Sequence, residues 1–159
     1  MTNNFSHVNN DNQPSIVNIF NKNITKRFAK ARSLMKLPMK VWKKLNNNKI
    51  INTKGAVLHT AIIAGIIAVK NTHNLIPLCH PLYIEDCQIK PKFSNNMILS
   101  FDCSVKNYGK TGVEMEALVG ASIAALTTYD MCKSVSHEIV IERIYLLSKT
   151  GGKNDFKQK

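Results

Sequence analysis

The chain of 159 residues has no acidic side chain between Asp11 and Glu85, although its formal net charge is +12. Lysines and arginines instead crowd the segment from Lys22 to Lys49. Such a basic excess is typical of proteins that attract nucleic acid or a phosphorylated small molecule. Compositional drift is the alternative, because Asn, Lys and Ile are abundant while Arg is scarce. The charge alone therefore does not decide between these interpretations.

Long hydrophobic runs and closely spaced cysteines are also missing. The longest apolar run, AIIAGIIAV at residues 61–69, is far shorter than the ~20 residues that cross a bilayer. The first residues resemble neither a secretory nor a transit signal, so we expect a cytoplasmic protein with no membrane partner. The four cysteines show no CxxC spacing, which favours reduced thiols over structural zinc.

The apolar patterns predict one α+β domain. We expect strands at residues 24–37, 82–93, 97–108 and 138–147, and long helices at residues 54–75 and 112–136. This β-α-β-β-α-β order indicates a ferredoxin-like antiparallel sheet with both helices on one face. An N-terminal strand at residues 15–20 and a short helix at residues 39–48 are added to it. Because both long helices are apolar nearly all round, we expect them to pack on the sheet and also against another subunit.

The domain boundaries follow from composition. Residues 1–14 are polar and are expected to form a flexible segment. Residues 15–150 are expected to form a single ferredoxin-like domain, and residues 151–159 a Gly/Lys-rich tail.

The segment LIPLCHPL, residues 75–82, suits neither a helix nor a strand. Pro77 and Pro81 bracket Cys79 and His80, and proline restricts both its own backbone and that of the preceding residue. His80 is therefore held rigidly, which suits a proton carrier or a phosphate donor. A packed structural histidine is the alternative.

The segment GKTGVEME, residues 109–116, opens the second long helix. Free N–H groups at such a helix start favour anions. Glu114 and Glu116 either complement the helix dipole or bind hydrogen-bond donor edges, such as a guanine-like amidine. Lys54, at the start of the first long helix, opposes the dipole, which weakly indicates a functional role.

Asp130 and Lys133, three positions apart, are neighbours near the end of the second long helix. They form either a plain surface ion pair or a functional pair, since the dipole disfavours Asp at that end. Glu116 and Asp130 are separated by about 21 Å of helix, too far to act on one atom. They therefore meet across a subunit contact or hold distant ends of a large substrate, and the apolar helices favour the first arrangement.

Five motifs occur together: KGAVLHTAIIAGIIAVK, LIPLCHPL, GKTGVEMEAL, AALTTYDMCK and LLSKTGGK. Because of these motifs, the chain resembles the cyclic pyranopterin monophosphate synthase family, which is also called the molybdenum cofactor biosynthesis protein C family. The resemblance extends from about His7 to Phe156. The resemblance implies a ferredoxin-like fold and a homohexamer built as a trimer of dimers, with sites shared between subunits. It also implies a lyase that converts 3′,8-cyclo-7,8-dihydroguanosine 5′-triphosphate to cyclic pyranopterin monophosphate and releases pyrophosphate.

The resemblance carries roles to the matching residues. It implies that Asp130 is the catalytic acid/base and Lys133 its partner. It also implies the residues that bind the substrate. The neighbouring subunit is expected to supply Met115 and Glu116, with Glu114 close by. Lys54 and Arg27 are expected near the triphosphate. The remaining members are Leu78, Cys79 and His80 in the pocket and Lys153, whose role is left open. No metal ligand and no cofactor are implied, and Mg²⁺ accompanying the triphosphate is left open.

Three positions depart from the family's usual pattern. Asn18 and Ala56 stand where an Asp is usual, and Ile62 stands where an Arg is usual. A degenerate paralogue without activity is therefore one alternative. A small basic RNA-binding protein is another, although no strand shows the interleaved aromatic and basic residues of an RNA-binding sheet, so no nucleic-acid partner is expected.

Overall fold

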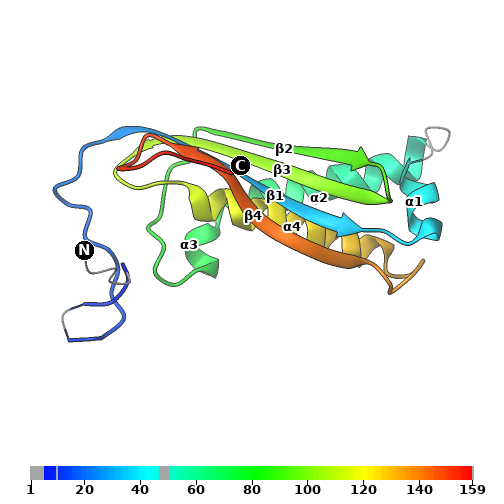
Figure 1. Cartoon of the computed structure of the whole chain (residues 1–159), viewed down its shortest axis with the longest axis horizontal. Coiled ribbons are helices and arrows are strands. Elements are labelled where there is room, and N and C mark those ends of the chain that lie inside the picture. Colours follow the sequence, from blue (N-terminus) through cyan, green and yellow to red (C-terminus); the bar gives the residue numbers. More distant parts are fainter. Residues whose placement is uncertain (1–5, 10, 47–50, 159) are drawn as a thin grey trace.

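The structure, a computed structural model, describes residues 6–9, 11–46 and 51–158, without the side chains of residues 51–55. The main strands are β1 (Thr25–Lys36), β2 (Asp86–Ser94), β3 (Ile98–Gly109) and β4 (Val140–Thr150), followed by the short β5 (Phe156–Lys157). The helices are α1 (Met39–Asn46), α2 (Ile51–Lys70), α3 (Thr72–Leu75) and α4 (Glu114–Cys132). Figure 1 shows the strands as one layer, with α2 and α4 as a second layer beneath it.

The sheet is antiparallel, with the strand order β2-β3-β1-β4-β5. β1 lies at its centre, and Ala31 is opposite Cys103 of β3 on one side and Leu146 of β4 on the other. This is the topology of the split β-α-β unit. The predicted α+β fold is therefore confirmed, with both long helices on one face of the sheet.

The core lies between this face and the helices. Side chains alternate along β1, so that Ala29, Ala31 and Met35 are fully buried. The two long helices also pack closely on each other, since a Cβ added at Gly65 of α2 would lie 2.8 Å from the Gly120 carbonyl oxygen of α4. Within the described part of the chain, no helix is long and apolar enough to cross a membrane.

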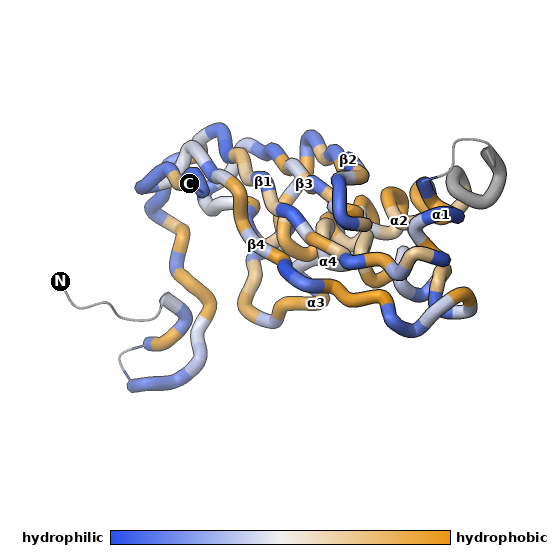
Figure 2. Tube along the Cα trace, turned by 45° about the vertical axis from the view of Figure 1, so that its right-hand side comes forward, coloured by the Kyte–Doolittle hydropathy of each residue, from blue (hydrophilic) through white to orange (hydrophobic). Residues whose placement is uncertain are grey.

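The strand predicted at residues 15–20 is wrong. In the described structure this segment joins no strand of the sheet, and the Asn18 Oδ1 atom accepts a hydrogen bond of 2.8 Å from the Phe20 N–H. A β-branched run has strand propensity, but it forms a strand only where an edge is available for pairing. The segment instead belongs to an arm that leaves the body of the molecule and carries hydrophobic stretches (Figure 2).

Several boundaries also differ from the sequence prediction. The helix predicted at residues 54–75 is divided into α2, which ends at Lys70, and the short α3. The helix predicted at residues 112–136 ends at Cys132, and the strand predicted at residues 82–93 begins at Asp86. The short helix predicted at residues 39–48 is present as α1 up to Asn46, and residues 47–48 lie outside the described part of the chain. The tail, for which no strand was predicted, returns to the sheet and pairs as β5 with β4. This pairing holds the Gly-rich turn against the start of β1.

Candidate active site

Two cavities meet at the start of α4. The first, of about 300 Å³, is bounded by the loop before β2 and by the first turn of α4. It brings together six residues predicted from the sequence: Leu78, Cys79, His80, Glu114, Met115 and Glu116. The second, of about 250 Å³, contains the predicted Arg27 and Lys153. Lys22, Thr111, Gly112 and Glu114 line both cavities, which therefore form one continuous site.

Cys79 and His80 lie in a short irregular segment between α3 and β2. The Cys79 N–H donates a 3.0 Å hydrogen bond to the Ile76 carbonyl oxygen, which closes a turn. Pro77 and Pro81 restrict the backbone on both sides of the pair. Both side chains are partly buried and line the first cavity, so the rigid placement predicted from the sequence puts His80 at the cavity wall.

Glu116 is the buried carboxylate of the first cavity, with only 4% of its surface exposed. Burial raises the pKa of Glu116 to about 7, and the neighbouring Glu114 charge adds to the rise, while a backbone hydrogen bond opposes it. Burial, together with the Glu116 charge, also raises the pKa of the Cys79 thiol. Glu116 therefore exchanges a proton near neutral pH, which is the range that a general acid or base requires.

The second cavity is strongly basic. A single carboxylate, Glu114, faces five cationic side chains: Lys22, Arg27, Lys110, Lys149 and Lys153. The Lys149 Nζ atom lies 3.0 Å from Glu114 Oε1. The Arg27 guanidinium donates to the carbonyl oxygens of Gly109 at 3.2 Å and Lys110 at 3.3 Å. This fixed surplus of positive charge suits a polyphosphate, because lysine and arginine bind phosphate oxygens with charge-assisted hydrogen bonds.

A glycine turn after β4 shapes the second cavity. The Thr25 hydroxyl donates to the Gly151 carbonyl oxygen at 2.7 Å. Gly151 has a φ of +83°, and a Cβ at this position would lie 1.8 Å from the Lys26 carbonyl oxygen. Glycine is therefore required at this turn, which brings Gly152 and Lys153 beside Arg27.

Three cationic residues of the second cavity were missed by the sequence analysis. Lys110 lies inside the GKTGVEMEAL motif and Lys149 inside the LLSKTGGK motif, so both had a specific signal. Lys22 had only the general basic excess as a signal, because the path of the arm before β1 is what brings it to the cavity. The Lys110 Nζ atom fixes this arm by donating to the Phe20 carbonyl oxygen at 2.7 Å.

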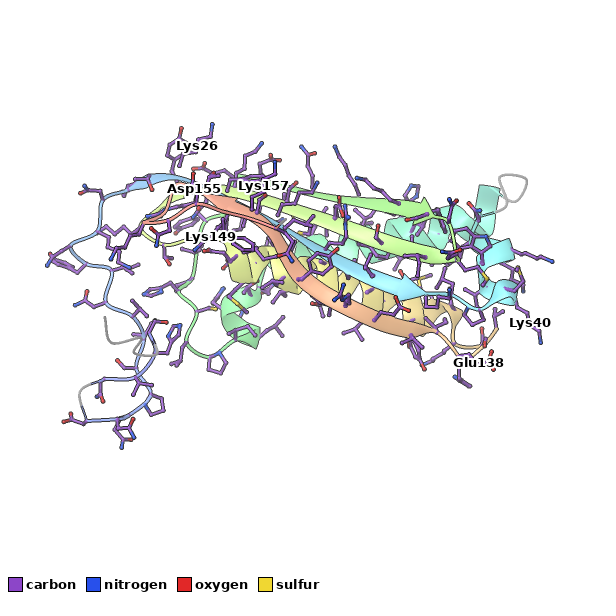
Figure 3. The ribbon with its side chains drawn as sticks, in the orientation of Figure 1. Lys26, Lys40, Glu138, Lys149, Asp155 and Lys157 are labelled. Carbon is purple, nitrogen blue, oxygen red and sulfur yellow. The ribbon has the colours of Figure 1, made fainter. Side chains whose placement is uncertain are left out.

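The predicted pair Asp130 and Lys133 lies at the opposite end of α4. Lys133 Nζ is 2.7 Å from Asp130 Oδ1, the Asp130 side chain is 70% exposed, and their hydrogen bond raises the pKa of Lys133. Neither residue lines the two cavities. In Figure 3, Lys149 marks the second cavity and Glu138, which follows α4, marks the region of the pair, and the two labels lie far apart along the sheet. The side chain of Lys54 lies outside the described part of the structure.

Metal ligands are not gathered in the described part of the chain, where no group of three or more His, Cys, Asp or Glu side chains could hold an ion. All four cysteines are free. The side chains that line the two cavities can transfer protons and bind an anion.

Comparison with known proteins places this site in a family. The sequence model of the MoaC family matches residues 16–152. The chain belongs to the MoaC family. The match includes every predicted site residue except Lys153, and it covers both ends of α4.

Other proteins related to this MoaC family member match most of its length. The cyclic pyranopterin monophosphate synthase of Xanthomonas oryzae pv. oryzae (strain MAFF 311018) is 45% identical over 150 residues, covering 94% of the chain and 91% of the relative. The protein of the same name from Staphylococcus epidermidis (strain ATCC 12228 / FDA PCI 1200) is 45% identical over 161 residues, covering 98% of each. Molybdenum cofactor biosynthesis protein 1 of Dictyostelium discoideum is 45% identical over 173 residues, and the chain spans 28% of that longer protein.

Proposed function

We propose that this MoaC family member is a cyclic pyranopterin monophosphate synthase. As a lyase, it converts 3′,8-cyclo-7,8-dihydroguanosine 5′-triphosphate to cyclic pyranopterin monophosphate and releases pyrophosphate during molybdenum cofactor biosynthesis. The observation that carries the proposal is the pair of joined cavities, because one contains the buried carboxylate of Glu116 while the other is lined by five cations. Relatives of nearly the same length bear the name of this activity.

The two cavities match the two ends of such a substrate. The basic cavity holds the triphosphate, because its cations can accept the charge that develops on departing pyrophosphate. The first cavity holds the guanine-derived ring, whose N–H donors suit the carboxylates of Glu114 and Glu116. His80 and Glu116 lie where protons can be moved at that ring. The reaction requires no cofactor in this proposal, and Mg²⁺ would bind with the triphosphate if it takes part.

The site is completed by a second subunit. Asp130 and Lys133 are exposed, and Asp130 lies about 21 Å along α4 from Glu116. We therefore propose that the neighbouring chain supplies them as the acid/base and its partner. Exposed Ile63 and Ile67 on α2 and Leu126 on α4 provide apolar surface for assembly. We propose a homohexamer, a trimer of dimers, with Lys54 near the triphosphate. Light scattering that shows a stable and active monomer would contradict this assembly.

The surroundings of the three departures from the family pattern favour an active enzyme over a degenerate paralogue, and the cysteines favour a cytoplasmic one. The Asn18 Oδ1 atom accepts the Phe20 N–H, a bond that an aspartate carboxylate would accept equally. Ile62 packs against the hydrophobic core, and Ala56 is exposed. Because the usual Asp and Arg are both replaced by apolar residues, neither charge is left buried without its partner. The four free cysteines suit a reducing compartment.

The direct test is incubation of the purified chain with the cyclised guanosine triphosphate derivative. We expect stoichiometric formation of cyclic pyranopterin monophosphate and pyrophosphate, measured by chromatography and by a coupled pyrophosphate assay. Arg27→Gln should weaken substrate binding, whereas Lys40→Gln, an exposed lysine on α1 (Figure 3), should not. A folded oligomer that binds the triphosphate but releases no pyrophosphate would support the degenerate paralogue.

A further inference from the structure

The face of the sheet opposite the helices has a cavity of its own. It measures about 320 Å³ and is formed by side chains of β1, β2 and β3. Apart from Phe28, none of its lining residues lines the two cavities of the candidate active site. The proposed function assigns no role to this cavity.

Asp102 of β3 lies at the centre of this face, with only 3% of its surface exposed. The strand registers place Arg32 of β1 and Lys90 of β2 directly opposite it, on either side. Arg32 Nη2 donates to Asp102 Oδ2 at 2.8 Å, and the Nζ atoms of Lys30 and Lys92 lie 3.1 and 3.2 Å from the same oxygen. Burial alone would raise the pKa of Asp102, but these hydrogen bonds outweigh burial and hold the pKa well below its usual range.

The charges around Asp102 do not balance. Four cations from two neighbouring strands surround one carboxylate, which leaves three positive charges uncompensated. Lys30 and Lys92 share one carboxylate oxygen, so their ammonium groups are held close together although like charges repel. Each ammonium carries three donors and therefore retains two beyond the bond to Asp102. Nearby, Lys106 is paired with Asp86 at 2.7 Å, and Ser104 adds a hydroxyl to the cavity wall.

We propose that this cavity binds a small phosphate anion, of the size and charge of pyrophosphate. Asp102 serves as a buried anchor that holds Lys30 and Lys92 in position, and their free donors bind the oxygens of the anion. Lys90, for which the described structure shows no hydrogen bond or ion pair, supplies a further charge from the adjacent strand. Two ammonium groups fixed in advance lose less conformational entropy on binding than free surface lysines do.

Other occupants fit the face less well. A second copy docked through this surface would bring the same positive surplus against itself, which is repulsive. Single-stranded nucleic acid usually stacks its bases on several aromatic side chains. Of the described residues that line the cavity, Phe28 alone is aromatic.

The test is titration calorimetry with inorganic pyrophosphate on the full chain at low ionic strength. We expect two binding equivalents per chain in the wild type, one at the active site and one on the sheet face. Lys30→Gln combined with Lys92→Gln should remove one equivalent and leave turnover unchanged, because Arg32 still pairs with Asp102. The matched control, Lys40→Gln with Lys43→Gln on α1, removes the same charge and should retain both equivalents.

A single substitution provides a second test in case the double variant does not fold. Lys90→Gln should weaken the second equivalent roughly tenfold, as expected for one charge-assisted hydrogen bond. A parallel titration with ATP distinguishes the two sources of such an anion: an ATP equivalent that the double variant loses shows that the site accepts the phosphates of a nucleotide, whereas loss of the pyrophosphate equivalent alone assigns the site to the free anion. The proposal is overturned if the double variant keeps every equivalent that the wild type binds, or if the α1 control loses one equally. These outcomes do not depend on turnover, so they are distinct from failure of the proposed function.

Discussion

Glu116 and Asp130 occupy opposite ends of the same helix, the first buried at its start and the second exposed at its end. The rise of an α-helix places them about 21 Å apart. One chain therefore cannot direct both carboxylates at a single reacting atom. Two copies can, if each site combines the start of α4 from one chain with the end of α4 from its neighbour.

Asp130→Asn should abolish turnover without changing the fold or the oligomeric state. The substitution keeps the shape of the side chain but removes its ability to exchange a proton and its ion pair with Lys133. Because Asp130 is exposed, stability should change by less than about 1 kcal/mol. The measurement is pyrophosphate release beside light scattering. Glu138→Gln, an exposed carboxylate at the same end of the molecule, is the control and should stay active.

Mixing two inactive variants tests the shared site. Glu116→Gln and Asp130→Asn should each be nearly inactive alone. After exchange of subunits, random pairing should leave about a quarter of the sites with both native residues, and activity should return to that level. Asp130→Asn treated alone in the same way controls for refolding effects. If labelled subunits exchange and no activity returns, both residues serve the site of one chain.

The raised pKa of Glu116 predicts a specific pH dependence of stability. The folded state holds a proton on Glu116 up to about pH 7, whereas the unfolded state releases it near the ordinary value of 4.5. Between these values the folded state binds more protons, so this group makes the free energy of unfolding fall as pH rises. The full effect is on the order of 3 kcal/mol. Glu116→Gln should therefore stabilise the substrate-free protein at pH 8 and have much less effect at pH 4.5.

Urea unfolding of the variant and the wild type at both pH values measures this effect. The other titrating groups contribute equally to the unfolding free energy of both proteins, so their contributions cancel in the difference. Glu142→Gln, on β4, serves as a control for the loss of a carboxylate. An equal change in unfolding free energy at pH 4.5 and pH 8 would show that folding does not raise the pKa of Glu116.

Gly151→Ala should destabilise the turn that carries Lys153. The left-handed φ of +83° disfavours any Cβ, and the added atom would collide with the Lys26 carbonyl oxygen. A cost of about 1–3 kcal/mol is expected from the backbone strain, together with weaker triphosphate binding. Gly152→Ala is the matched control for stability, since Gly152 has no left-handed φ and its Cβ would meet a side-chain atom, Arg27 Nη1 at 3.1 Å, instead of a backbone atom. Similar unfolding free energies for the two variants would contradict this account of the turn.

Much of the fold is determined by local patterns in the sequence. Alternation along β1 and the apolar helices α2 and α4 predicted the element order, because the period of burial follows directly from strand and helix geometry. The two prolines around Cys79 and His80 likewise predicted a rigid segment, since proline acts on its own backbone. The strand predicted at residues 15–20 failed because strand formation depends on a partner, which local propensity does not describe.

The properties of the candidate site were decided by the tertiary structure. The sequence identified Glu116 and Lys153 by motif and Arg27 by family resemblance, but the burial of Glu116 and its raised pKa appear only in the folded structure. The path of the arm before β1 likewise brings Lys22 to the basic cavity. Asp102 had no motif at all, because its surroundings come from strands that are far apart in sequence. Burial and electrostatic environment arise from contacts between distant segments, so they appear only when the chain has folded.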